Sequence, residues 1–209
     1  MKEGILPQEE FRSQFLSSSR FAPLIENTRR FLDTHPSIHH YDFLRSFTGR
    51  LYEELGYLWL RGRLGHKVRL LDPDETLSYF LDLYGGLPSQ ALLQGGILNE
   101  YVPDGLILPI EEGGRGDAVV VEYTATAANA RLPTYIHHKE EMVGNLRKRF
   151  PPLFGHGKLE IMFTEETSRT VAHTHVADQR TKLRSSSHSH PHVGAFAREL
   201  VATQFPELK

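Results

Sequence analysis

Two apolar stretches joined by a glycine-rich connection constrain the fold of this 209-residue chain more than any other feature of its sequence. Residues 102–109 read Val-Pro-Asp-Gly-Leu-Ile-Leu-Pro, and residues 117–124 read Asp-Ala-Val-Val-Val-Glu-Tyr-Thr. The connection at 111–116 contains three glycines, which supply the positive φ angles that a hairpin connection needs. The sequence therefore predicts two neighbouring β-strands.

Each predicted strand carries one carboxylate among apolar neighbours, Asp104 in the first strand and Glu122 in the second. Because side chains alternate along a strand, Glu122 lies inside the strand pattern. A carboxylate in a half-buried strand is costly unless it is paired, hydrogen-bonded or bound to a cation. If the hairpin brings the two acids together, they repel each other, and a divalent metal is the simplest compensation. Taken alone, Pro103-Asp104-Gly105 is equally typical of a turn that enters a strand.

Composition and charge exclude several classes of protein. A content of 39% hydrophobic and 24% charged residues is typical of one soluble globular domain, and no apolar run is long enough to span a membrane. The chain has no cysteine, which excludes disulfides and thiolate metal sites and is compatible with a cytoplasmic location. With a net charge of -2, any affinity for nucleic acid must come from a local patch.

Hydrophobic periodicity and capping residues predict the remaining elements. Expected helices cover residues 8–35 with a break at 17–19, then 42–60, 72–84, 134–150 and 193–203, and expected strands cover 66–71, 97–101 and 157–164. Asp72 and Glu75 form a predicted capping box, Gly62 and Gly65 are expected to end the second helix, and Pro151-Pro152 the fourth. Residues 171–183 are ambiguous, and the serine- and histidine-rich tract 185–192 predicts an exposed loop.

This order of elements predicts an α/β fold with mixed connections. We expect an N-terminal helical extension at residues 1–40, an α/β core at 41–165, and a C-terminal loop and helix at 166–209 that pack on the same domain.

At this point the sequence resembles the restriction-endonuclease-like nuclease superfamily, also written PD-(D/E)xK. Its shared core is helix, three strands, helix, strand, and its signature is Pro-Asp on one strand followed by Asp or Glu, any residue and Lys on the next. Pro103-Asp104 matches the first half, and Glu122-Tyr123-Thr124 matches the second except for the lysine. Gly49 to Glu53 resembles a further family feature, a glutamate four positions after a glycine on the first core helix. The resemblance covers about residues 43–164.

The resemblance implies metal-dependent hydrolysis of phosphodiester bonds in nucleic acid, with DNA as the expected substrate and Mg²⁺ or Mn²⁺ as the cofactor. Asp104, Glu122 and Glu53, or less favourably Glu54, would be the metal ligands. Some family members supply the missing lysine from the following helix, where Lys139 falls on the apolar stripe of this chain. A basic cluster on the same helix would contact the nucleic-acid backbone: Arg147, Lys148 and Arg149.

Other interpretations remain open. Thr124 in place of the motif lysine favours a catalytically inactive member of the same fold, a module that binds nucleic acid or assembles with other proteins. A protein partner could supply specificity, and a homodimer would suit the cutting of both strands of a duplex. Taken singly, Glu53 and Glu54 are typical of a solvated helix face. The basic cluster at 147–149 is typical of an exposed helix end. Lys139 is equally typical of a side chain that snorkels at the rim of the core.

The histidines suggest a second hypothesis, a transition-metal site built from residues 137–138, 173–175 and 188–192. None of these groups has the helical spacing of a zinc protease. The glycine-rich connection lacks the lysine of a nucleotide-binding loop, and no serine has the context of a nucleophile, so an NTPase or a serine hydrolase is disfavoured.

Overall fold

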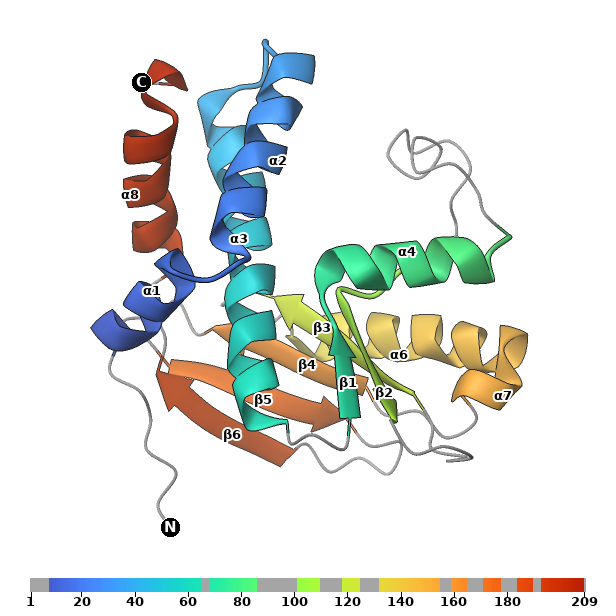
Figure 1. Cartoon of the computed structure of the whole chain (residues 1–209). Coiled ribbons are helices and arrows are strands. Elements are labelled where there is room, and N and C mark those ends of the chain that lie inside the picture. The colour runs from blue at the N-terminus through green and yellow to red at the C-terminus, as the bar shows by residue number, and fades with distance from the viewer. Residues whose placement is uncertain are drawn as a thin grey trace.

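The computed structural model describes residues 8–64, 68–85, 101–109, 118–124, 132–154, 159–164, 171–177, 184–189 and 193–208. The helices in these ranges are α1 Gln8–Leu16, α2 Phe21–Thr34, α3 His40–Arg63, α4 Pro73–Leu83, α6 Leu132–Arg149, α7 Pro151–Phe154 and α8 Val193–Gln204, followed by a 3₁₀ turn at Pro206–Leu208 (Figure 1). The strands are β1 Val68–Leu71, β2 Gly105–Pro109, β3 Val119–Thr124, β4 Leu159–Thr164, β5 Val171–Ala177 and β6 Arg184–Ser189.

The six strands form one mixed sheet in the order β1-β2-β3-β4-β5-β6. Strands β3 and β4 are parallel, with Glu122 opposite Ile161, whereas every other neighbouring pair is antiparallel. A parallel pair needs a crossover connection, and the segment that contains α6 and α7 supplies it. The predicted α/β class with mixed connections is confirmed.

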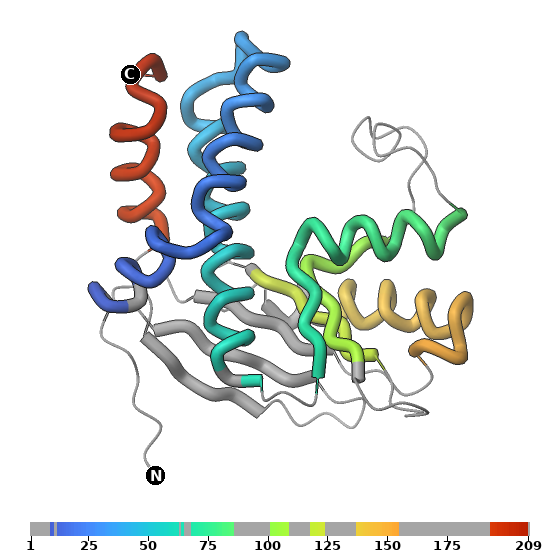
Figure 2. The backbone as a smooth tube through the Cα atoms, viewed as in Figure 1, coloured from blue at the N-terminus to red at the C-terminus, as the bar shows by residue number. Residues whose placement is uncertain are grey.

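Alternation along β1, β2 and β3 divides the buried side chains between two hydrophobic clusters. Leu70, Ile107, Val121 and Tyr123 pack with α3 in the first cluster. The intervening residues pack with α4, α6 and α7 in the second cluster: Leu71, Leu106 and Val120. Glu122 has the parity of Val120, so it points toward the face that α6 covers. The tube in Figure 2 shows α4 leaving β1 and running beside α6.

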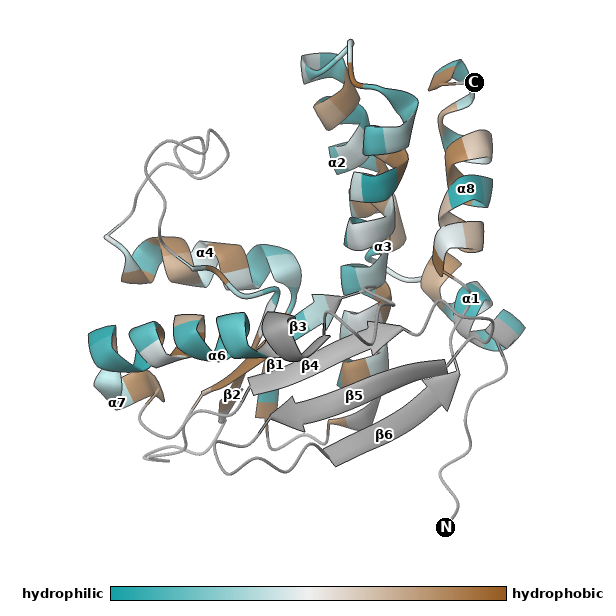
Figure 3. Ribbon diagram, turned by 180° about the vertical axis from the view of Figure 1, so that it is seen from behind, coloured by the Kyte–Doolittle hydropathy of each residue, from teal (hydrophilic) through white to brown (hydrophobic). Residues whose placement is uncertain are grey.

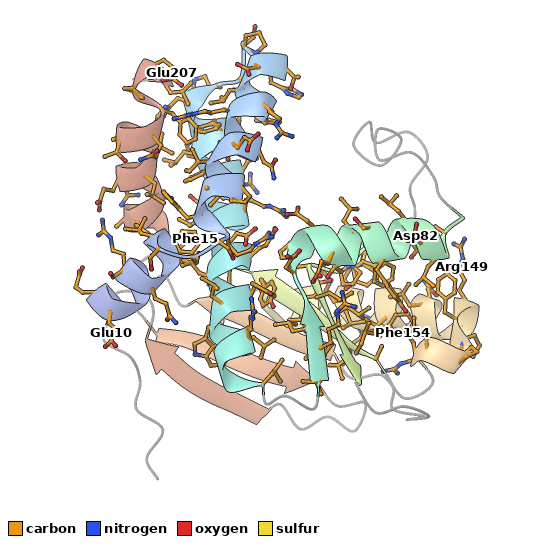
Figure 4. All side chains as sticks on the ribbon, in the orientation of Figure 1. Glu10, Phe15, Asp82, Arg149, Phe154 and Glu207 are labelled. Atoms are coloured by element: carbon orange, nitrogen blue, oxygen red, sulfur yellow. The ribbon has the colours of Figure 1, made fainter. Side chains whose placement is uncertain are left out.

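The helices near the two ends of the chain pack against α3 as well as against each other. The rings of Phe43 and Phe47 on α3 each meet Phe205, which follows α8, edge to face. Phe15, at the end of α1 and labelled in Figure 4, contacts Phe196 of α8 in the same way. Figure 3 shows apolar segments recurring along α2, α3 and α8. Burial of these aromatic side chains stabilises the long helix that leads to the sheet.

Several predicted elements are confirmed with small changes in their bounds. The capping box is present, because the Glu75 N–H donates to Asp72 at 2.8 Å and the Asp72 N–H donates to Glu75 at 3.1 Å. Helix α3 continues through Gly62 to Arg63, one turn further than predicted. Helix α6 ends at Arg149, just before Pro151-Pro152, as predicted, and the same two prolines start the short α7, where the missing N–H of proline does no harm.

Three further predictions have different outcomes. The strand predicted at 66–71 is confirmed for its described part, since Val68–Leu71 form β1, a paired member of the main sheet, and α4 lies between β1 and β2. Residues 97–100 lie outside the described ranges, and strand β2 starts at Gly105. Residues 184–189 form β6, not an exposed loop, because their backbone groups pair with β5. Backbone pairing does not need apolar side chains, so a serine-rich edge strand escapes detection by hydrophobic pattern.

A close approach at Gly56 sets the distance between α3 and β3. A Cβ at this position would lie 2.5 Å from Cδ1 of Tyr123, too close for any real contact. Gly56 is one turn after Glu53 on the same side of the helix, so this contact also fixes how near Glu53 comes to the strands.

We expect Gly56→Ala to lower the free energy of unfolding by about 1–3 kcal/mol, because the added methyl must displace either the Tyr123 ring or α3. Gly62 is the matched control: it lies in the same helix, is exposed, and would have no atom within 4 Å of its Cβ. Gly62→Ala should raise stability by about 0.5–1 kcal/mol through helix propensity. Urea denaturation of both variants checks the pair, and a stabilising Gly56→Ala would contradict the close approach.

Candidate active site

The carboxylates of Asp104 and Glu122 meet at the start of β2. Asp104 immediately precedes β2, and its Oδ2 accepts a hydrogen bond of 2.9 Å from the backbone N–H of Tyr123. That bond holds the acid against β3, where the next residue back along the chain is Glu122, only 1% exposed. The two predicted metal ligands are therefore neighbours, as the hairpin pattern indicated.

Lys139 reaches this pair from α6. Its Nζ lies 2.7 Å from Oε2 of Glu122, and its side chain is 18% exposed. The lysine is therefore neither a snorkelling rim residue nor distant from the carboxylates. This ammonium supplies a positive charge to the strand residue Glu122 from a helix.

Tyr101 completes the surroundings of Glu122 and was missed in the sequence. Its hydroxyl donates a hydrogen bond to Oε1 of Glu122, and Lys139 Nζ lies 5.1 Å from the centre of its ring. Tyr84, at the end of α4, in turn donates a hydrogen bond of 2.7 Å to the carbonyl of Tyr101. The only sequence signal was an aromatic residue three positions before Asp104, which is too common to single out.

Burial raises the pKa of both central acids. The pKa of Glu122 rises to about 8, first through burial and then through the charge of Asp104, while Lys139 and Tyr101 oppose the shift. Burial also raises the pKa of Asp104, opposed by the Tyr123 N–H and by Lys139. One ammonium group therefore does not offset two buried carboxylates, and the pair retains a proton near neutral pH.

Glu53 adds a third acid near the pair. Burial raises its pKa to about 7, the charge of Asp104 adds to the rise, and Arg50 opposes it. The guanidinium of Arg50 lies 2.7 Å from Glu53 and 2.9 Å from Asp74 at the start of α4. The predicted solvated face is wrong for Glu53, because the packing of α3 on β3 turns this residue toward Asp104.

Glu54 has a different partner, and its alternative assignment as a metal ligand is wrong. Its buried carboxylate receives two hydrogen bonds of 2.7 Å from Arg20, which precedes α2. The same guanidinium also reaches Asp72 at 2.9 Å and Asp74 at 3.0 Å. Arg20 thus ties the N-terminal helices to α3 and to the start of α4 through one charge cluster, and Asp74 links that cluster to Arg50.

The remaining predicted residues lie away from the pair. Lys148 and Arg149 are exposed near the end of α6, about 15 Å along the helix axis from Lys139. Arg147 is partly buried, and its Nε has no hydrogen-bond partner among the described residues. On the same helix His137 and His138 are exposed. The side chains of the other predicted histidines, and that of Thr124, fall outside the described part of the chain.

The acid pair fits a cation through its chemistry. Within the described ranges, no three acidic or histidine side chains converge closely enough to enclose a metal ion by themselves. Asp104 and Glu122 would supply two oxygen ligands, and water and substrate oxygens would supply the others, which is the usual way proteins hold Mg²⁺. A divalent cation would replace the shared proton and relieve the repulsion between the two acids. Glu53, held by Arg50, is a neighbour of this pair, and its role as a ligand stays a prediction.

The sequence matches no model of a protein family, and no characterised protein matches it. None of the helices in the described ranges is both long and apolar enough to cross a bilayer. Function is therefore inferred from the geometry of the site.

The raised pKa of Glu122 gives stability a defined pH dependence. Between the unfolded pKa near 4.5 and the folded pKa near 8, the folded protein binds one proton more than the unfolded chain. The contribution of Glu122 to stability is therefore fully present at low pH and is lost as pH rises through this window, by an amount on the order of a few kcal/mol. Without divalent metal, Glu122→Gln should flatten the fall in stability from pH 5 to pH 8, whatever its effect at a single pH.

The measurement is urea denaturation with a chelator present at several pH values. Glu26→Gln, at an exposed carboxylate on α2, is the control and should keep the slope of the wild type. An unchanged slope in Glu122→Gln would show that the acid titrates normally in the folded protein.

The Arg20 cluster should matter for stability far more than a surface ion pair. Arg20→Ala leaves Glu54 buried without its partner, and we expect a loss of about 3–5 kcal/mol. The matched control is Arg30→Ala on α2, whose exposed pair with Glu26 should be worth less than about 1 kcal/mol. Thermal or urea unfolding compares the two, and equal losses would mean that the buried cluster does not stabilise the fold.

Proposed function

We propose that this protein is a metal-dependent nuclease of the restriction-endonuclease-like type. The observation that carries the proposal is the contact of 2.7 Å between Lys139 Nζ and Glu122 beside Asp104. These three side chains come from β3, α6 and the start of β2, and the sheet order places β3 beside a parallel β4. With α4 between β1 and β2 and the short α7 before β4 treated as insertions, the order α3, β1, β2, β3, α6, β4 is similar to the helix, three strands, helix, strand core of that superfamily.

Phosphodiester hydrolysis needs charge stabilisation at the transferring phosphate and an activated water. Bound Mg²⁺ or Mn²⁺ would lower the pKa of that water and neutralise charge on the phosphate. Asp104 and Glu122 would hold the ion through carboxylate oxygens. The Tyr123 N–H fixes Asp104, and Tyr101 fixes the orientation of Glu122, so the two ligands are oriented before any substrate binds.

Lys139 would act at the phosphate or at the attacking water. Its ammonium pairs with Glu122, which points toward the face of the sheet that α6 covers, and the lysine side chain is partly exposed. A cation at that place stabilises the negative charge that develops during hydrolysis. Lys139 would thereby compensate for Thr124. Because α6 packs on this face of the sheet, its side chain reaches Glu122, the acid that a lysine at position 124 would otherwise serve.

The alternative is a catalytically inactive domain of the same fold that binds nucleic acid or another protein. The observation that favours it is Thr124 at the motif position, together with an ion pair that already engages Lys139. DNA as substrate, a homodimer, and a protein partner that supplies specificity belong to the proposal in either form. In both forms, Arg147, Lys148 and Arg149 would provide a positive surface for the phosphate backbone.

The nuclease proposal predicts cleavage of DNA or RNA in the presence of Mn²⁺ or Mg²⁺, abolished by chelation. Asp104→Asn and Glu122→Gln should lower the cleavage rate by at least about 100-fold, and Lys139→Ala by about 100-fold, because each removes a ligand or a stabilising charge. Lys139→Arg should retain more activity than Lys139→Ala.

Metal binding is measured separately, through the rise in melting temperature on addition of Mn²⁺. We expect this rise in the wild type and in Lys139→Ala but not in Asp104→Asn. Glu199→Gln, at an exposed carboxylate on α8, controls for nonspecific effects and should behave as the wild type. A wild type that binds Mn²⁺ and nucleic acid yet cleaves nothing would favour the inactive domain, and the absence of any Mn²⁺ effect would refute the metal site.

A further inference from the structure

A hollow of about 280 Å³ has Tyr101, the hydrogen-bond partner of Glu122, in its lining. It is formed by the end of α4, by the segment before β2 and by one side of α6. Its lining includes Tyr84, Tyr101, His138, Met142, Asn145 and Arg149. Four of the lining residues from α6, at positions 138, 142, 145 and 149, recur at helical spacing, so they form a continuous strip along the helix.

Tyr101 joins the hollow to the proposed catalytic centre. The hydroxyl of Tyr101 donates to Glu122, and Lys139 Nζ lies 5.1 Å from the ring that lines the hollow. A molecule in the hollow is therefore separated from the carboxylate by one side chain. Tyr101 therefore forms the boundary between the hollow and the charged centre.

The far end of the hollow is cationic. Arg149 is on the last turn of α6 and extends toward the end of α4 (Figure 4). Its guanidinium carbon lies 4.6 Å from the centre of the Tyr84 ring and 5.4 Å from that of Phe150. Packing against two rings holds the planar group in place, and a fixed guanidinium suits the oxygens of a phosphate.

The middle of the hollow combines apolar and polar surface. The Tyr101 ring and the Met142 side chain present polarisable surface, and the Asn145 amide offers both a donor and an acceptor. Glu141 also lines this region and lies 3.5 Å from His137, so the middle does not favour an anion. A flat ring with polar edges matches this part, whereas a phosphate matches the end at Arg149.

We propose that this hollow binds the nucleotide that adjoins the scissile phosphate. The base occupies the middle, beside Tyr101 and Met142, with Asn145 at its edge, and Arg149 contacts the phosphate on its far side. This inference rests on the proposed function, since it places the neighbouring phosphate at Asp104, Glu122 and Lys139. Under this proposal Arg149 contacts one defined phosphate, whereas the neighbouring Lys148 contributes only general electrostatic attraction.

The test measures binding without cleavage. Fluorescein-labelled homopolymeric oligonucleotides, DNA and RNA, are titrated with full-length protein in the presence of a chelator, and fluorescence anisotropy gives the dissociation constant. Arg149→Ala should weaken binding about tenfold, and Asn145→Ala should weaken it about threefold and reduce the differences between bases. Lys148→Ala should cost only about twofold as an exposed charge, and Arg198→Ala, exposed on α8, controls for overall charge.

Two further variants separate folding from binding. Arg149→Lys keeps the charge but loses the planar group against Tyr84, and should lie between the wild type and Arg149→Ala. Melting temperatures show whether each variant is folded, and Arg30→Ala, at an exposed position on α2 outside the hollow, should bind as the wild type does.

The outcomes distinguish this inference from the nuclease proposal. Equal losses in Lys148→Ala and Arg149→Ala, or wild-type binding by Asn145→Ala and Arg149→Ala, would overturn the nucleotide site even if the protein cleaves nucleic acid with Mn²⁺. Binding that depends on Arg149 and Asn145 in a protein that never cleaves would support the site and overturn the nuclease. A wild type that binds none of the oligonucleotides overturns both.

Discussion

The burial of Glu122 on a central strand is the constraint on which the rest of this site depends. A carboxylate that is 1% exposed must be compensated, and two groups contribute, the ammonium of Lys139 on α6 and the hydroxyl of Tyr101. The strand register also brings Asp104 alongside, and the charge of this second acid works against them. The compensation is incomplete, which is why the pKa of Glu122 stays near 8. A core that retains an unfavourable pair of acids at one place has the electrostatics of a cation site.

A second charge cluster supports this arrangement from the N-terminal side. Arg20 binds Glu54, and Asp74 connects Arg20 with Arg50, which holds Glu53. Adjacent glutamates on α3 therefore have different environments, one buried in the ion cluster and the other beside Asp104. Because successive residues of a helix differ by about 100° in direction, one helix can serve both the packing of the terminal helices and the site on the sheet.

The sequence predicted those parts of the fold that local rules govern. The capping box at Asp72 and the alternation through residues 119–124 correspond to interactions within a few residues, and both are present. Strand β6 was missed because serine-rich segments have no apolar alternation, and its pairing with β5 is a contact between distant residues. No sequence pattern marked the close approach at Gly56 either, because the constraint comes from the Tyr123 ring on another element.

The residues of the site also divide into those that local sequence patterns predicted and those that only the packing of the fold brought together. By itself the sequence predicted that Asp104 and Glu122 lie close together, because alternation and a glycine-rich connection indicate a hairpin. In the structure Asp104 immediately precedes β2 and Glu122 lies within β3. It also identified Lys139 as a charged residue at a helix position where the pattern predicts an apolar one. Only the tertiary structure decided that Lys139 meets Glu122, that Tyr101 bonds the same acid, and that Glu53 and not Glu54 faces Asp104. These pairings depend on how α3 and α6 pack on the sheet, and helix packing is set by side-chain volumes from many distant residues, which no local pattern records.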